Sequence, residues 1–346
     1  MDKTDIDTYF QRDIAMSTWQ DLTNEERRIT LDVIEKETLM NANAIEKDWC
    51  VMMVLNALFR SSCRDYLCFK GGTSLSKGWN LINRFSEDID IAIDKSLWDI
   101  KGDTESQRDK LRKVSRKFIQ EKLCVEIESI LKDMGVSDFS ISFKESPSSD
   151  TDPSTLFISY TSVANQVVSY IPPSVKVEIS CRSLWKPCKV IEYKSIIAAH
   201  YPEEDFADTP FPANTVYPSR TFLEKVFLLH EEFQKSFIRT NRMSRHLFDL
   251  EKMMDTKYAQ EALSDREMYN TIIQHRKDYT PIRGIDYSLH SPATINIIPP
   301  ESVLNAYEED YKRMQSSFIY GGSISFEKLM ERIGELNGRI RKITDK

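Results

Sequence analysis

The spacing of apolar and polar residues divides the chain into a mixed first half and a helical second half. Short apolar or alternating runs are typical of strands. They occur at 65–69, 88–94, 138–144, 155–163 and 174–180. Longer stretches at 41–61 and 104–134 have helical spacing, and the first is apolar on nearly all its sides. We therefore expect an α+β first half in which the helix at 41–61 is buried behind a sheet.

The second half follows a stretch that is rich in proline. Residues 196–220 contain four prolines and are predicted to form a loop, so we expect domains of 1–205 and 206–346. Thr221 and Glu224 have the spacing of a capping box, which predicts a helix that starts at Thr221 and carries Lys225 in its first turn. Further helices are expected from their spacing. They cover 258–277, 299–318 and 324–342.

Two aspartates interrupt the apolar run at 88–94. Asp88 and Asp90 are two residues apart, so on a strand their side chains share one face while Ile89 and Ile91 occupy the other. Carboxylates are costly to place in such a run unless a positive charge meets them. Two converging carboxylates suit a divalent cation, Mg²⁺ or Mn²⁺.

Two glycines follow the strand predicted at 65–69. Gly71 and Gly72 permit a sharp turn and the close approach of a ligand, and a helix is predicted to begin near Thr73. The exposed N–H groups of a helix start attract phosphate. We therefore expect Gly71, Gly72, Thr73 and Ser74 to form a phosphate cradle beside the acidic pair.

The order of these motifs is similar to that of a known group of enzymes. Gly-Gly-Thr, a spacer and then Asp-Ile-Asp resembles the polymerase-β-type nucleotidyltransferase superfamily, and with Lys70, Arg84 and Ser86 alongside it resembles the AbiEii/AbiGii toxin family. The resemblance implies a polymerase-β-like domain, with a mixed sheet and flanking helices, followed by a helical domain. It also implies the toxin of a bacterial toxin–antitoxin or phage-defence system, with a cognate antitoxin as partner.

Further site residues are implied by the same resemblance. A third carboxylate from a neighbouring strand matches Glu178, and a downstream lysine and aspartate match Lys225 and Asp249. Each has an ordinary alternative. Lys176 and Glu178 would share a strand face that is simply exposed and charged, and Lys225 and Asp249 would be an ordinary surface lysine and helix aspartate.

Other charged residues are weaker candidates. They are Arg242, Arg245, His230 and His246. Lys47-Asp48-Trp49 also resembles the opening segment of the family, and we interpret it as support for the fold.

Composition and charge limit the class of protein. The net charge of −7 argues against a surface coated in nucleic acid. Between Arg108 and Lys122, however, seven basic residues face two acidic ones, which indicates either a solvated helix face or a surface for RNA phosphates. The six cysteines include no C-x-x-C pair and are expected to be free thiols. The N-terminus has no secretory pattern and no apolar run could span a bilayer, so we expect a cytoplasmic protein without a membrane partner.

The hypothesis is a metal-dependent nucleotidyltransferase that moves NMP from an NTP to RNA. The resemblance favours the tRNA 3′ end as the acceptor, whereas the residues themselves do not identify it. One alternative is the same chemistry on a small molecule or a protein. Another is a catalytically silent regulator that binds nucleotide or RNA.

Overall fold

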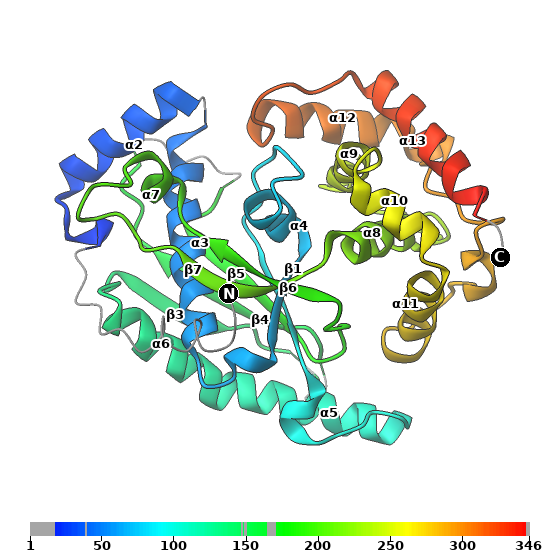
Figure 1. The fold of residues 1–346 in the computed structure, drawn as a ribbon, viewed down its shortest axis with the longest axis horizontal. Coiled ribbons are helices and arrows are strands. Elements are labelled where there is room, and N and C mark those ends of the chain that lie inside the picture. Colours follow the sequence, from blue (N-terminus) through cyan, green and yellow to red (C-terminus); the bar gives the residue numbers. More distant parts are fainter. Residues whose placement is uncertain (1–17, 39, 147, 149–150, 165–170, 344–346) are drawn as a thin grey trace. The chain divides into compact units, whose positions relative to one another are not determined.

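A seven-stranded mixed sheet forms the centre of the first half of the chain (Figure 1). The computed structural model describes residues 18–38, 40–146, 148, 151–164 and 171–343. The sheet order is β3-β4-β5-β2-β1-β7-β6. The strands are β1 (Leu67–Lys70), β2 (Ile89–Ile93), β3 (Phe139–Phe143), β4 (Ser154–Tyr160), β5 (Ser174–Ser180), β6 (Cys188–Tyr193) and β7 (Phe211–Val216).

Parallel and antiparallel pairs alternate in the middle of the sheet. β2 pairs with β1 in the antiparallel sense and with β5 in the parallel sense, and β1 pairs with β7 in the parallel sense. On β5, Val175, Val177 and Ile179 are buried while the residues between them are half-buried, as a strand with one core face requires. The predicted α+β class with a mixed sheet is therefore confirmed for this half.

Helices cover the apolar face of this sheet. They are α2 (Asn24–Thr38), α3 (Ala42–Arg60), α5 (Glu105–Phe118), α6 (Cys124–Asp133) and α7 (Ile196–His200). The predicted burial of the helix at 41–61 is confirmed, because α3 is buried along nearly its whole length and shares one core with β2 and β5. All six cysteines are free, as expected.

The prediction of a loop over residues 196–220 is wrong. The structure has α7 at its start and β7 near its end, and β7 pairs with β1 through Phe69 and Thr215. Prolines normally argue against an inner strand because they have no N–H to donate. Here Pro212 lies near the start of β7, which leaves the rest of the strand able to pair.

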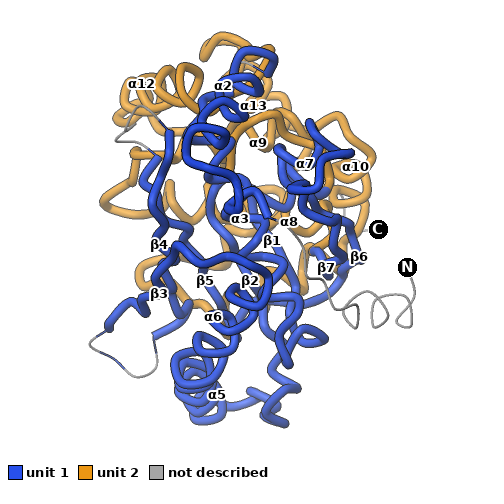
Figure 2. Tube along the Cα trace, turned by 90° about the vertical axis from the view of Figure 1, so that its left-hand side faces the viewer, with its two compact units in different colours: residues 1–78, 87–215 blue, residues 79–86, 216–346 orange. Residues whose placement is uncertain are grey.

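The chain separates into two compact units, which Figure 2 colours differently. Unit 1 comprises residues 1–78 and 87–215, and unit 2 comprises residues 79–86 and 216–346. The boundary expected at 205/206 precedes β7, whereas the units divide after Thr215 because β7 belongs to the sheet of unit 1. Residues 79–86 belong to unit 2 although they lie between the glycine motif and Asp88 in sequence.

Unit 2 is helical. Its helices are α8 (Pro218–Glu232), α9 (Ser244–Met253), α10 (Lys257–Ser264), α11 (Arg266–Tyr279), α12 (Glu301–Ser317) and α13 (Phe326–Arg341). The predicted capping box at Thr221 is wrong, because α8 begins at Pro218 and Tyr217 is its N-cap. Proline is well suited to the first helical position. Lys225 consequently lies in the second turn of α8 and not in the first.

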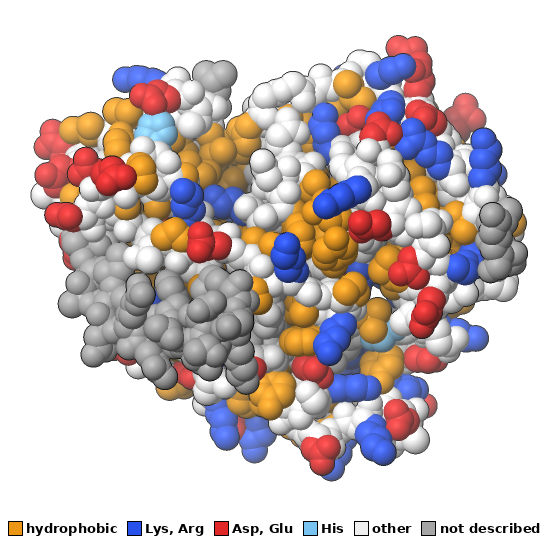
Figure 3. All heavy atoms as spheres, in the orientation of Figure 1, with side chains coloured by type: hydrophobic (Ala, Val, Ile, Leu, Met, Phe, Trp, Pro, Cys, Tyr) orange, Lys and Arg blue, Asp and Glu red, His pale blue; other side chains and the backbone are white. Residues whose placement is uncertain are grey.

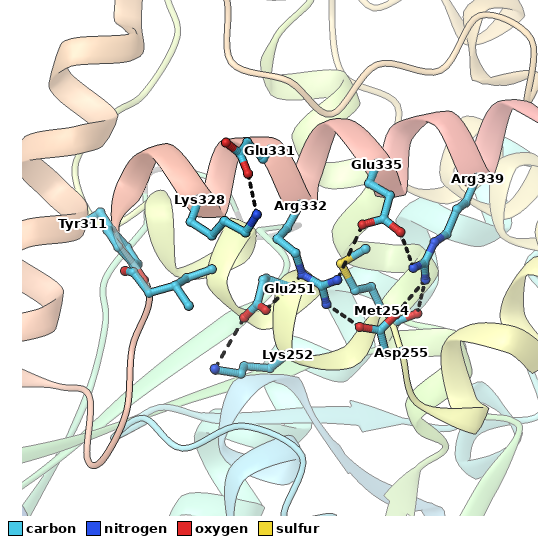
Figure 4. A network of polar contacts seen from close by, with 11 residues as sticks. Glu251, Lys252, Met254, Asp255, Tyr311, Lys328, Glu331, Arg332, Glu335 and Arg339 are labelled. Carbon is cyan, nitrogen blue, oxygen red and sulfur yellow. Dashed lines mark hydrogen bonds and ion pairs between the residues drawn. The ribbon is translucent and has the colours of Figure 1, made fainter.

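Ion pairs join α13 to the end of α9 (Figure 4). Arg332 pairs with Glu251 at 3.4 Å and with Asp255, and Arg339 pairs with Asp255 at 2.9 Å. Basic and acidic side chains are interspersed on the face of the molecule in Figure 3. Among the helices of the described ranges, none is both long and apolar enough to cross a bilayer.

Candidate active site

The glycine motif and the acidic pair meet in unit 1. Gly71 has a φ of +84°, in the region that favours glycine, and a Cβ placed there would lie 2.2 Å from Oδ2 of Asp90. Only glycine allows this contact without a shift of Asp90. The expected close approach at Gly71 is therefore made by a carboxylate of the same chain.

A row of polar side chains crosses the sheet at the level of Asp90. Lys70 of β1 lies directly opposite Asp90, Asp90 lies beside Glu178 of β5, and Glu178 lies opposite Thr155 of β4. Residues paired in this way project from the same face of a sheet. Register thus brings Glu178, 88 positions after Asp90 in the numbering, next to it on the polar face of the sheet.

Asp88 lies just outside β2, which begins at Ile89 and not at Asp88 as the sequence predicted. Its carbonyl oxygen accepts a hydrogen bond of 2.6 Å from the Thr73 hydroxyl, and the Ser74 hydroxyl donates to the carbonyl of Gly71 at 2.9 Å. Both hydroxyl residues are buried. Thr73 therefore joins the glycine turn to the acidic segment through its side chain, while Ser74 closes the turn onto Gly71.

The helix predicted after the glycines is short. Gly71–Thr73 forms one α-helical turn, which continues as a π-helical turn over Ser74–Gly78. This helix starts at Gly71 and not near Thr73, because the backbone turns at the first glycine.

The carboxylates fit a hard divalent cation in donor type. Asp88, Asp90 and Glu178 offer only oxygen ligands, which Mg²⁺ and Mn²⁺ favour. In the described ranges, however, no three acidic, histidine or cysteine side chains are gathered closely enough to hold an ion. Glu178 instead pairs with Lys176 at 2.9 Å. Lys176 would therefore compete with a metal at this face for the Glu178 carboxylate.

A second charged cluster lies inside unit 2. Arg84 makes two hydrogen bonds to the Asp249 carboxylate, at 2.6 and 2.8 Å, and Lys225 Nζ lies 2.8 Å from Asp249 Oδ2. All three side chains are buried. Lys225 of α8 and Asp249 of α9, both predicted as site residues, are thus in direct contact.

The charges of this cluster follow from its partners. Burial alone would raise the pKa of Asp249, but Arg84 and Lys225 hold it well below its usual range, so the carboxylate is ionised. Burial lowers the pKa of Lys225, and the Asp249 carboxylate acts in the opposite direction. One carboxylate is therefore the shared ion-pair partner of two buried basic side chains.

The weaker candidates mostly have structural partners. His230 Nδ1 accepts a hydrogen bond from the Asn296 N–H at 3.0 Å, and Arg242 lies over the ring of Phe318. His246 is buried, and burial lowers its pKa well below the usual value. Arg245 is half-buried on α9.

Three basic neighbours of the candidate residues were not predicted as site residues: Lys70, Lys176, and Arg84, which binds Asp249. Lys70 lies opposite Asp90 in the strand register, and its ammonium donates to the Ser183 hydroxyl at 2.9 Å. Lys176 forms an ion pair with Glu178. Lys70 directly precedes the glycines, so its position in the motif was a signal for it. Ser183 has no sequence signal of this kind, because it reaches Lys70 only through folding.

Comparison with known proteins places these residues in a family. A search of curated proteins found no match. The family model described as "Nucleotidyl transferase AbiEii toxin, Type IV TA system" matches residues 54–332. This match covers more than half of the chain and includes Gly71, Asp90, Glu178, Lys225 and Asp249. The chain therefore belongs to the AbiEii family of nucleotidyl transferase toxins of type IV toxin–antitoxin systems.

Proposed function

We propose that this protein transfers NMP from an NTP to a hydroxyl of an RNA, with the tRNA 3′ end as the acceptor. The acceptor oxygen forms a bond to the α-phosphorus, the bond from that phosphorus to the β-phosphate oxygen breaks, and pyrophosphate leaves with the electron pair. The observation that carries this proposal is the contact of Gly71 with Asp90, beside Glu178 in the strand register. It supports a polymerase-β-like arrangement of the site.

The proposed roles in unit 1 follow from the polar face of the sheet. Asp88, Asp90 and Glu178 would hold Mg²⁺ or Mn²⁺, which when bound neutralises charge on the reacting phosphates. We propose that Glu178 also helps to take the proton of the acceptor hydroxyl. The backbone of Gly71 and Gly72 would cradle the β- and γ-phosphates, in a turn shaped by the buried hydroxyls of Thr73 and Ser74.

Lys225 is proposed to neutralise charge on the triphosphate, and Asp249 to orient it. The ion pair of 2.8 Å between them supports the orienting role. Arg84 binds both oxygens of the same carboxylate. Lys225 would act through its position and its charge, without transferring a proton.

The basic helix α5 supports RNA as the acceptor. Lys110, Lys113, Lys117 and Lys122 are exposed on α5 and the turn that follows it. Exposed lysines of this kind bind phosphates without reading sequence. A cognate antitoxin is the proposed protein partner, because the family is that of type IV toxin–antitoxin systems.

Labelled transfer tests the proposal. Purified protein is incubated with each α-labelled NTP, Mg²⁺ and total RNA, and label on RNA is measured for the wild type and for Asp90→Asn. We expect label on RNA of tRNA size and a loss of about 100-fold or more in Asp90→Asn, because the carboxylate charge is removed while the side-chain volume stays. Circular dichroism should show that this variant remains folded.

Other outcomes would replace the proposal. Label on a protein or a small molecule would indicate the same chemistry with another acceptor. Nucleotide or RNA binding without any transfer, unchanged in Asp88→Ala, would indicate a silent regulator. Charge reversal at Lys110, Lys113 and Lys117 should abolish labelling of RNA, whereas reversal at the exposed Lys312 and Lys328 of unit 2 should not.

A further inference from the structure

Helix α3 buries three consecutive charged residues, and two of them, Lys47 and Asp48, have partners next to the candidate site. Lys47 is 2% exposed and Asp48 is 4% exposed. Buried charges are costly unless they are paired and hydrogen-bonded. The partners of these two residues therefore indicate what the charges hold in place.

Lys47 holds the chain segments that precede two of the candidate carboxylates. Its ammonium lies 2.7 Å from Oε2 of Glu87, the residue before Asp88. The same ammonium donates to the carbonyl of Pro172 at 3.0 Å, just before β5, the strand that carries Glu178. One cation thus joins the approach to Asp88 to the approach to Glu178.

Asp48 holds the far end of the glycine segment. Its Oδ1 lies 2.9 Å from Lys77 Nζ, and Lys77 lies in the helical turn that follows Gly71 and Gly72. Its Oδ2 also accepts the backbone N–H of Ile196 at 2.7 Å, which fixes the carboxylate from a second side. The next residue, Trp49, packs on Trp19 and faces the apolar core.

We propose that Lys47 and Asp48 are positioning residues for the transfer site, which hold Asp88, Glu178 and the glycine turn at the spacing that metal and nucleotide binding require. This inference rests on the function proposed above. Both residues precede the matched region 54–332. Outer partners that fix the ligands of a metal typically alter its affinity by about 10- to 100-fold when they are removed.

The neighbouring residue Glu46 provides a matched control. It is 2% exposed on the same helix, accepts hydrogen bonds from Ser162 and from the Val163 N–H, and contacts neither Glu87 nor Lys77 through them. Loss of Glu46 should therefore lower stability without altering the spacing of the site. A positioning role and a purely structural role can be separated by this comparison.

The test measures metal binding, turnover and stability in the full chain. Binding of Mn²⁺ is followed by electron paramagnetic resonance, kcat and KM by labelled transfer, and Tm by calorimetry. We expect Asp48→Asn and the double variant Lys47→Met/Glu87→Gln to bind Mn²⁺ about 10- to 100-fold more weakly and to lose kcat. Removing both charges of the Lys47 pair avoids an unpaired buried carboxylate, so the double variant should fold.

Glu46→Gln should lower Tm but keep the Mn²⁺ affinity and kcat of the wild type. The inference is overturned if the folded double variant and Asp48→Asn both retain the Mn²⁺ affinity and kcat of the wild type, or if Glu46→Gln weakens Mn²⁺ as much as they do. If the wild type neither binds Mn²⁺ nor transfers label, the proposed function fails, and this inference fails with it.

Discussion

At the scale of single residues, the candidate site of unit 1 contains one glycine and one carboxylate that occupy neighbouring space. Gly71 combines a positive φ with a neighbour that a Cβ would overlap. Gly284 has the same φ of +84° but no neighbour within 4 Å of a Cβ. Substitutions at these two positions therefore separate the cost of a strained backbone from the effect of displacing Asp90.

Gly71→Ala should reduce transfer about 100-fold, whereas Gly284→Ala should only destabilise the protein. Both substitutions should cost about 1–2 kcal/mol through the left-handed backbone. Gly71→Ala should also displace Asp90, and a shift of about 1 Å in a reacting group costs about 100-fold in rate. Urea unfolding and labelled transfer measure the two effects. Equal activity of the two variants would contradict the role given to Gly71.

Lys176 acts as an internal counter-ion of Glu178. Both side chains are about one-third exposed, so their ion pair is worth only about 0.2–1 kcal/mol. Because a bound cation would compete with this pair, Lys176→Met should bind Mn²⁺ up to about five-fold more tightly. Lys132→Met is the matched control, since Lys132 pairs with Glu128 at 2.7 Å on an exposed helix face. Weaker binding by Lys176→Met would show that Lys176 assists the metal or the nucleotide instead.

At the scale of elements, helix α9 holds Asp249 and receives its N-terminal cap from another helix. The N-cap residue Met243 has no side-chain hydrogen bond of its own to offer. The Asp310 carboxylate of α12 instead accepts the N–H groups of Arg242 and Ser244, at 2.6 and 2.9 Å. Asp310 is buried, so this cap ties α12 to the start of α9.

Asp310→Ala should reduce the free energy of unfolding by about 1–3 kcal/mol, because buried N–H groups lose their acceptor. Asp265→Ala removes an exposed cap of α11 and should cost only about 0.5–1 kcal/mol. Urea denaturation of both variants checks the difference. A smaller loss for Asp310→Ala than for Asp265→Ala would mean that α9 does not depend on this cap.

At the scale of the whole molecule, stability should fall on acidification because of groups buried in unit 2. Burial, reinforced by the neighbouring His290, lowers the pKa of His230 from 6.5 to about 4. Burial would raise the pKa of Glu232, but Arg239 and Lys235 hold it at about 2. In both cases the unfolded chain takes up a proton at a higher pH than the folded chain does.

The free energy of unfolding should therefore decrease as pH falls from 6.5 toward 4 through His230, and from 4.5 toward 2 through Glu232. Each group contributes a slope that approaches about 1.4 kcal/mol per pH unit within its window. His290 and Glu231, which face the same cluster, remain in place in His230→Gln. Urea midpoints across this range should show a smaller slope above pH 4.5 for His230→Gln. An unchanged slope would contradict the assignment to His230.

Local patterns were sufficient to predict much of the fold and part of the local geometry around the candidate site residues. The alternation at 174–180 predicted both β5 and the shared face of Lys176 and Glu178, and Gly71-Gly72 predicted the turn. The strand β7 and the start of α8 were missed, because Pro212 and Pro218 were interpreted as loop residues. Proline disrupts the interior of a strand or helix, but it is tolerated near the start of either, where these two prolines lie.

The sequence by itself determined which residues carry the acidic and glycine motifs, because spacing along a strand or turn depends only on near neighbours. Tertiary structure decided which charges meet. Arg84 and Asp249 are 165 positions apart, and Lys47 and Pro172 are 125 apart, yet each pair is within hydrogen-bond distance. Such contacts arise when strands and helices pack, since the burial of one charge then requires a partner from a remote part of the chain.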